Sequence, residues 1–164
     1  MPENRAYPPE GLTPPAPYTL AELRSAMESR AVVEGVARRC DAALNLSVQL
    51  GRISAIMPRE EAIAPWISGA NREIAVLSRV GKPICCTVES IAADAKGAPL
   101  VTVSRRQAQE QAMDAMLENL RPGSVVAGRV VRMEPFGAFV DIGRGIVALL
   151  PTEFISAARI RRPE

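Results

Sequence analysis

Histidine is absent from the 164 residues of this chain. Because histidine is the commonest general base near neutral pH and the commonest metal ligand, its absence argues against acid–base catalysis and against most metal sites. No apolar run approaches the roughly 20 residues of a membrane-spanning helix, and the N-terminus lacks the basic-then-apolar pattern of a signal peptide. We therefore expect a cytoplasmic protein with no membrane partner, no cofactor and no metal.

Cysteine is scarce, and Cys40, Cys85 and Cys86 form no CxxC spacing. This odd number without that spacing indicates neither a disulfide framework nor a thiolate zinc site. Cys85 and Cys86 are adjacent in an apolar run, so on a strand their side chains point to opposite faces and at least one belongs to the core. With no histidine to activate a thiol, we expect no catalytic cysteine.

Net charge is low, at +2 from 20 cations and 18 acids. Phosphate binding requires clustered cations, so this total predicts no anionic partner by itself. Only Lys82 and Lys96 are lysines. Arginine suits planar recognition of phosphate, but a GC-rich genome explains the same bias.

The order of local patterns predicts a mainly β protein. Residues 1–18 hold six prolines and almost no aliphatic side chains, so we expect a flexible tail there. Thr19 and Glu22 form a capping box that opens a helix ending near Arg30. Short β-type runs, a helical connection and a tight turn then follow, the runs at 31–40, 44–50, 53–57, 84–91 and 99–103, the connection at 60–80 and the turn at 94–97.

Five short strands with a helix between the third and the fourth are the layout of an OB-fold, a small Greek-key barrel. We therefore predict a five-stranded barrel, with its leading helix, over residues 19–104. Ser104 and Gln107 predict a second capping box and a connecting helix over residues 105–121. Arg121, Pro122 and Gly123 then end that helix.

The same pattern begins again after this helix. The segment 32–35 is echoed 93 residues later by the segment 125–128, and Gly51 is matched by Gly143 at a distance of 92. Four further pairs keep the distance of 93, and these are Ile53 and Ile146, Ala55 and Ala148, Pro58 and Pro151, and Glu60 and Glu153. Repeats of this kind tolerate the insertion or deletion of one residue in a hairpin.

Residues 122–164 are enough for only three strands of a second copy, so we expect an open sheet with an unpaired edge. Three explanations are open. The chain is a fragment, another molecule supplies the missing edge, or the segment is only partly folded. We favour the fragment.

The segment from Gly128 to Gly143 resembles the opening of an S1 RNA-binding domain, in which a GxV strand leads into an FGAFVDIG-type strand. The resemblance implies S1-type OB domains that bind single-stranded RNA through two phenylalanines on one sheet face, here Phe136 and Phe139. An aromatic ring on an exposed sheet face stacks on any base. Arg132 and Arg144 lie on nearby strands, where we expect them to meet phosphates.

The alternative is that both phenylalanines belong to the core. They are three residues apart, so on an unbroken strand they face opposite sides, and a bulge at Gly137 is needed to bring them together. The family often has a histidine just after the third strand, where this chain has Pro151, which predicts weaker RNA binding. Further basic clusters at 105–106 and 159–162 are either solvated charge or phosphate contacts.

The first repeat has Leu44 and Leu46 where we place the two phenylalanines of the second, so it lacks a stacking platform. From Thr19 onward the chain resembles the bacterial ribosomal protein S1 family, whose first domains dock on the small ribosomal subunit or on proteins. The resemblance implies a docking role for the first repeat.

Together these features predict a single-stranded RNA-binding protein of translation or RNA metabolism, with the small ribosomal subunit as a candidate partner. Two alternatives are a protein-docking module and an accessory RNA-binding part of a larger RNA-processing enzyme. The chain has no P-loop, no GxSxG motif and no cluster of metal ligands, so we do not expect an enzyme. The preference for RNA over DNA rests on the resemblance, because OB barrels bind both.

Overall fold

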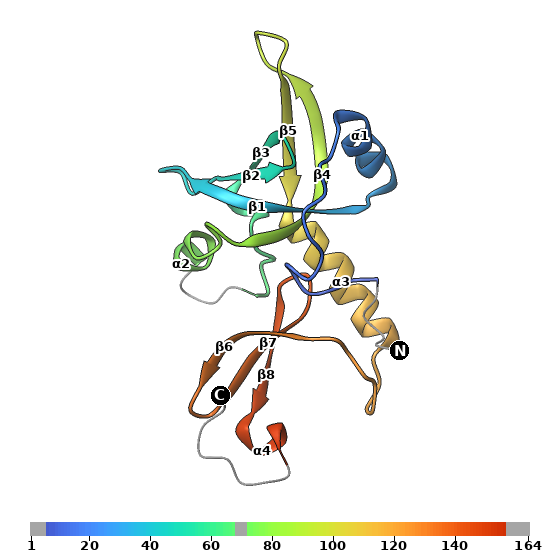
Figure 1. The fold of residues 1–164 in the computed structure, drawn as a ribbon, viewed down its shortest axis with the longest axis vertical. Coiled ribbons are helices and arrows are strands. Elements are labelled where there is room, and N and C mark those ends of the chain that lie inside the picture. The colour runs from blue at the N-terminus through green and yellow to red at the C-terminus, as the bar shows by residue number, and fades with distance from the viewer. Residues whose placement is uncertain (1–5, 68–71, 157–164) are drawn as a thin grey trace.

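A computed structural model describes residues 6–67 and 72–156 of the chain. These residues form a closed five-stranded barrel and a three-stranded sheet, and the long helix α3 (Arg105–Asn119) leads from the first to the second (Figure 1). The mainly β fold with an OB-type barrel and a second, three-stranded sheet, as expected from the sequence, is confirmed.

The barrel has the strand order β1-β2-β3-β5-β4 and closes by pairing of β1 with β4. Only β3 and β5 run parallel to each other, and the remaining neighbours are antiparallel. This is the topology of an OB-fold. Its elements are α1 (Leu20–Ser29), β1 (Val32–Cys40), β2 (Leu46–Leu50), β3 (Ile53–Met57), the 3-10 helix η1 (Arg59–Glu61), α2 (Arg72–Leu77), β4 (Pro83–Ala93) and β5 (Pro99–Ser104).

Alternation along the strands places the barrel core. On β2 the side chains of Leu46, Val48 and Leu50 are buried, while Ser47 and Gln49 between them are partly exposed. Successive side chains of a strand point to opposite faces, so this pattern fills the barrel interior with every second residue. The other strands contribute further core residues, among them Val33, Ala37, Met57, Ile84, Cys86, Val101 and Val103.

Two local predictions for the barrel are confirmed. Thr19 caps α1, because its backbone N–H donates to Glu22 Oε2 at 2.7 Å while its hydroxyl accepts from the Glu22 N–H at 3.3 Å. Gly97 closes the β4–β5 turn with φ +80°, and its N–H donates to the Asp94 carbonyl. The predicted helical connection is shorter than expected, since its described part holds only η1 and α2.

The second half consists of α3, β6 (Arg129–Glu134), β7 (Gly137–Gly143), β8 (Ile146–Pro151) and the short α4 (Thr152–Ile155). The Ser104 hydroxyl caps α3 by accepting from the Gln107 N–H at 3.0 Å. The reciprocal half of the predicted capping box does not form. The Gln107 side chain instead accepts from Thr87 Oγ1 at 3.1 Å and donates to Glu89, which fastens α3 to β4.

The strand pairing repeats between the two halves. A register shift lies between Ala37 and Arg39 on β1, and another lies 93 residues later between Val130 and Arg132 on β6. Val48 pairs with Ala55 in the barrel, as Val140 pairs with Ala148 in the second sheet. In the barrel, residues 32–36 form part of a strand by pairing with β4. The described second sheet contains no counterpart of β4, so the matching segment 125–128 has no partner there and is not a strand.

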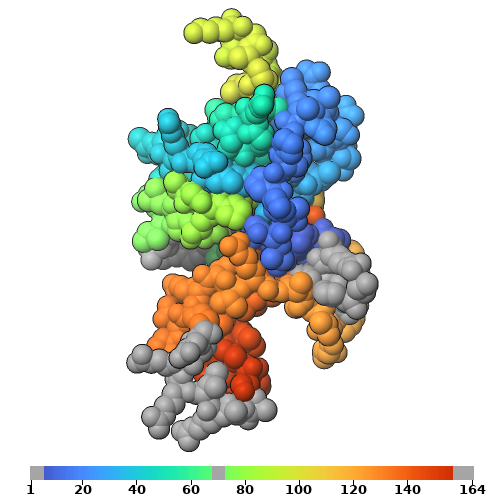
Figure 2. All heavy atoms as spheres, in the orientation of Figure 1, coloured from blue at the N-terminus to red at the C-terminus, as the bar shows by residue number. Residues whose placement is uncertain are grey.

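The N-terminal segment differs from the flexible tail that its composition predicts. Its described residues, 6–18, form no helix or strand, yet Tyr7 and Glu10 are only 2% and 4% exposed. Tyr7 packs with Ala112, Met116 and Ile146. In Figure 2 the blue segment runs over the barrel to the orange start of the second sheet. One tyrosine and one buried carboxylate hold the N-terminal segment against the rest of the protein. A count of aliphatic residues does not detect such contacts.

Within the described residues, no helix has both the length and the apolar character needed to cross a membrane.

Candidate nucleic-acid interface

The two phenylalanines singled out in the sequence lie together on the surface of the second sheet. Phe136 occupies the β6–β7 turn and is 57% exposed, and Phe139 on β7 is half-buried. Their ring centroids are 6.2 Å apart, and the ring planes meet at 85°. This is the edge-to-face arrangement that aromatic pairs prefer. The exposure of Phe136 rules out the alternative that both rings belong to a core.

The predicted bulge at Gly137 is wrong. Gly137 pairs with Glu134 on one side and with Pro151 on the other, without a register shift at either place. The shift lies on β6, between Val130 and Arg132. Phe136 reaches Phe139 because it precedes β7 and belongs to the turn, where the alternation of a strand does not apply.

Arg132 lies beside this pair. It is the cross-strand partner of Phe139, and its guanidinium carbon lies 4.8 Å from the Phe139 ring centroid. Its Nε is 3.0 Å from Glu134 Oε1, and 64% of the side chain is exposed. An ion pair this exposed contributes little free energy, so the guanidinium can exchange Glu134 for an external anion at low cost.

Strand alternation extends this surface along the sheet. Leu149 pairs with Phe139, and Val147 pairs with Asp141, so their side chains lie on the same face as the Phe139 ring. Leu149 is 49% exposed and Val147 is 44% exposed. We name this surface the aromatic face, consisting of Arg132, Phe136, Phe139, Val147 and Leu149. It offers flat apolar area with a cation at its edge.

Arg144 does not join the aromatic face. It lies in the β7–β8 turn with φ +47°, at the opposite end of β7 from Phe136. Its Nη1 donates to Gln111 Oε1 at 3.0 Å and its Nη2 to the Ala6 carbonyl at 2.8 Å. The sequence places Arg144 near the phenylalanines, but the structure uses it to fasten the turn to α3 and to the N-terminal segment.

The described residues of the barrel form no aromatic counterpart of this face. Ser47 pairs with Arg39 as Phe139 pairs with Arg132, so Ser47 occupies the place of Phe139. The predicted equivalence of Leu46 is wrong, because Leu46 matches Ala138 and is buried in the barrel. Five residues separate Cys40 from its partner Leu46, whereas four separate Met133 from its partner Ala138, and this difference of one residue shifts the alignment. Leu44, in the turn of the barrel, packs against the core.

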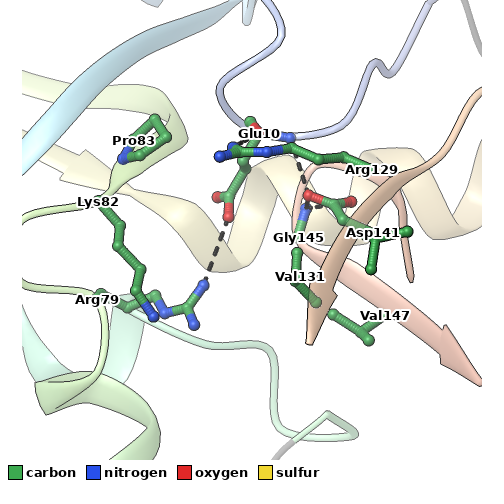
Figure 3. A pocket seen from close by; sticks show the side chains of 10 residues that line it. Glu10, Arg79, Lys82, Pro83, Arg129, Val131, Asp141, Gly145 and Val147 are labelled. Atoms are coloured by element: carbon green, nitrogen blue, oxygen red, sulfur yellow. Dashed lines mark hydrogen bonds and ion pairs between the residues drawn. The ribbon is translucent and has the colours of Figure 1, made fainter. Parts of the chain in front are cut away.

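A pocket of about 210 Å³ lies where the barrel meets the second sheet, and the sequence gives no sign of it. Three cations line it, Arg79, Lys82 and Arg129, together with the acids Glu10 and Asp141. Figure 3 shows Arg79, Lys82 and Pro83 on one side and Arg129, Asp141, Val131 and Val147 on the other. We name it the junction pocket.

Both acids of the junction pocket accept hydrogen bonds from other groups of the protein. The Glu10 carboxylate accepts from Arg105 Nε at 2.7 Å and from Arg105 Nη2 at 2.8 Å. The Asp141 carboxylate accepts from the N–H groups of Glu10, Gly143 and Gly145. Burial raises the pKa of Asp141, and these three hydrogen bonds oppose the rise.

The basic cluster at residues 105–106 serves the fold. Arg105 is 3% exposed and pairs with Glu10, and Arg106 Nη2 lies 2.8 Å from Glu61 Oε1. The sequence left two interpretations of this cluster open, solvated charge and phosphate contact. Arg105 fits neither of them, because it is buried and paired with Glu10. The second cluster, at residues 159–162, lies outside the described residues.

The closed barrel defines the class as an OB-type β protein, and its second sheet carries the exposed aromatic face. Residues 119–164 match the family model of the S1 RNA binding domain. The chain is also similar to the small ribosomal subunit protein bS1 of Staphylococcus aureus (strain COL), with 35% identity over 68 residues. That match covers 39% of this chain and 17% of the relative.

Two further relatives carry the same name. The protein bS1 of Neisseria meningitidis serogroup B is 42% identical over 67 residues, which cover 38% of this chain and 12% of that protein. The protein bS1 of Staphylococcus saprophyticus is 43% identical over 51 residues, which cover 31% of this chain and 13% of that protein. The chain thus spans a small fraction of the length of these relatives.

Proposed function

We propose that this protein binds single-stranded RNA through the aromatic face. The observation that carries the proposal is the exposed edge-to-face pair of Phe136 and Phe139, with Arg132 beside it, inside the segment that matches the S1 RNA binding domain. Every base has a flat π surface, so such a face binds single strands without reading their sequence.

Each residue of the face has a distinct part in the proposed mechanism. One base stacks on the exposed Phe136 ring, and a neighbouring base stacks on Phe139 together with the Arg132 guanidinium. Stacking on an aromatic side chain contributes about 1–3 kcal/mol per base. Arg132 then exchanges its exposed contact with Glu134 for a backbone phosphate. Arg144 has no part in this mechanism, since its donors bond to Gln111 and Ala6.

We place this activity in translation or RNA metabolism in the cytoplasm, with the small ribosomal subunit as the candidate partner. The names of the similar proteins support this placement, since each is a small ribosomal subunit protein. The role we propose is binding without catalysis. The alternative is that the chain is an accessory RNA-binding part of a larger RNA-processing enzyme. The same aromatic face would bind RNA in that role.

We propose further that the barrel is the first of two S1-type copies and that it docks on protein. The repeated strand order and register shift support a common origin of the two halves. Ser47 in the place of Phe139 leaves the barrel without a stacking platform. On the same face Ile56, the cross-strand partner of Ser47, is 45% exposed and offers apolar area to a protein.

Fluorescence anisotropy of labelled oligouridine, titrated with the full chain across a salt series, tests the RNA proposal. The double variant Phe136→Ala/Phe139→Ala should weaken binding at least tenfold, since about 1.4 kcal/mol corresponds to tenfold in affinity. Phe154→Ala is the matched control, because Phe154 is 71% exposed but lies on α4, outside the aromatic face.

Two outcomes separate the candidates. Unchanged affinity of the double variant would remove the stacking mechanism. No salt-sensitive binding by the unaltered chain would make protein docking the better explanation. A parallel series with oligodeoxythymidine measures the preference for RNA, for which the family match is the only support.

A further inference from the structure

The junction pocket and the aromatic face share one side of the second sheet. Asp141 follows Phe139 by two residues on β7, and Val147 precedes Leu149 by two residues on β8. Residues two apart on a strand project to the same face, about 7 Å from each other. Because Asp141 and Val147 line the pocket, the aromatic face leads directly into it.

The opposite wall of the pocket belongs to the barrel. Arg79 and Lys82 lie in the turn between α2 and β4, and Pro83 is the first residue of β4 (Figure 3). Arg129, at the start of β6, faces them from the second sheet. Cations from both halves of the protein therefore meet at one place.

Within the described residues, each of these three cations has some donors without a protein acceptor, although Arg79 Nη2 donates to Ser78 Oγ at 3.5 Å. No side-chain partner of Lys82 is found among the described residues, and its backbone N–H and carbonyl hold Arg79 and Ala37. Arg79 Nη1 lies 3.8 Å from Glu10, whose carboxylate already receives two hydrogen bonds from Arg105. Arg129 donates from Nη1 to the Glu10 carbonyl at 2.7 Å.

This arrangement fits an anion. The three cations of the lining and Arg105 together outnumber the two acids of the lining, so the net charge of the site favours an incoming anion. A phosphodiester entering the pocket meets three cations, while its neighbouring sugar and base remain at the exposed Val147 and Leu149. Phosphate contacts of this kind fix the position of a strand without reading its bases.

We propose that the junction pocket binds a backbone phosphate of the same RNA strand whose bases stack on the aromatic face. The barrel then takes part in RNA binding through Arg79 and Lys82, although it has no aromatic face of its own. This inference rests on the proposed function and extends the RNA site across both halves of the protein.

The length of the RNA and the salt dependence of its binding distinguish contacts in the junction pocket from contacts on the aromatic face. Phe136 lies at the turn end of β6, and Arg129 lies at the other end, about 17 Å away along the strand. An oligouridine of about 12 nucleotides, within the range that OB domains cover, reaches both places, whereas one of about 2 nucleotides, which ends at the two stacked bases, does not. Each phosphate contact on a single strand adds about 0.7 to the slope of log affinity against log salt.

The test compares Lys82→Gln with Lys96→Gln in the full chain, by anisotropy with both oligouridines across a salt series. Lys82 is exposed, and among the described residues its hydrogen bonds are made by the backbone, so the variant should fold, which a urea titration checks. Lys96, the matched control, lies in the β4–β5 turn at the far end of the barrel from the second sheet (Figure 1). Lys82→Gln should weaken binding of the longer oligouridine about three- to tenfold and lower its salt slope by about 0.7.

The affinity for the short oligouridine should stay unchanged in Lys82→Gln. If Lys82→Gln binds the longer oligouridine like Lys96→Gln, with the same salt slope, while Phe136→Ala/Phe139→Ala binds weakly, the pocket inference fails and the proposed function stands. If the double phenylalanine variant binds both oligouridines normally, the stacking function is wrong. The inference that one RNA strand occupies both the aromatic face and the junction pocket is then wrong as well, whatever the effect of Lys82→Gln.

Discussion

The carboxylate of Glu10 lies 2.7 Å from Nε and 2.8 Å from Nη2 of Arg105, 95 residues further along the chain. Both side chains are almost wholly buried, at 5% and 3% exposure. Glu10 also accepts a hydrogen bond from the Cys85 N–H, and its own N–H donates to Asp141. One residue of the N-terminal segment thereby connects the barrel, α3 and the second sheet.

Glu10→Gln should lower the free energy of unfolding by about 3–5 kcal/mol, because it leaves the Arg105 guanidinium buried without a counter-charge. Urea denaturation measures the change. Glu60→Gln is the control, since Glu60 is exposed and lies 3.7 Å from Arg59, and its loss should cost under about 1 kcal/mol. Equal effects of the two variants would contradict a structural role for the Glu10–Arg105 pair.

Arg144 and Arg132 should differ in their effect on stability. Arg144→Gln removes hydrogen bonds to Gln111 and to the Ala6 carbonyl, which should cost about 1–3 kcal/mol. Arg132→Gln alters a side chain that is 64% exposed and should change stability by under about 0.5 kcal/mol. The two urea midpoints decide this, and a larger loss for Arg132→Gln would argue against the structural assignment of Arg144.

Acid should reduce the contribution of Glu61 to stability. Burial tends to raise the pKa of Glu61, but hydrogen bonds from Arg106 and Ser104 outweigh it and hold the pKa below its ordinary value. A lowered folded-state pKa stabilises the fold above the unfolded pKa, and this contribution is lost as pH falls through the folded value. The stability difference between the unaltered protein and Glu61→Gln should therefore shrink as pH falls below about 4.3.

Urea titrations of both proteins at neutral pH and at acid pH measure that difference. Arg106→Gln should show the same narrowing, because it removes the partner that lowers the Glu61 pKa. A difference that stays constant with pH would contradict the assigned role of Glu61.

A thiol reagent should distinguish the three cysteines. Burial raises the pKa of both Cys85 and Cys86, which favours the unreactive thiol, and both side chains are at most 3% exposed. Cys40 is half-exposed, although partial burial and the neighbouring Asp41 also raise its pKa. We expect one slowly reacting thiol in the folded protein and three in urea, with Cys40→Ser removing the first. Rapid labelling of Cys85 or Cys86 in the folded state would contradict their burial.

Short-range patterns explain what the sequence predicts well. The Thr19–Glu22 capping box, the Asp94–Gly97 turn and the β2 alternation each involve residues within a few positions of one another, and all three are present. The phenylalanine pair was found through the resemblance, since spacing alone left a core position open. The match of Leu46 to Phe139 failed because one residue of difference in a turn moves every later residue to the other face of the strand.

The sequence by itself therefore determined the five barrel strands and their order along the chain, whereas the two phenylalanines came from the family resemblance. Tertiary structure alone decided that Glu10 meets Arg105, that Lys82 faces Arg129 across a pocket, and that Arg144 bonds within the fold. The physical reason is that strand alternation and capping act between near neighbours, whereas a buried charge acquires its partner only when barrel closure brings distant segments together. Such contacts leave no periodic pattern along the chain.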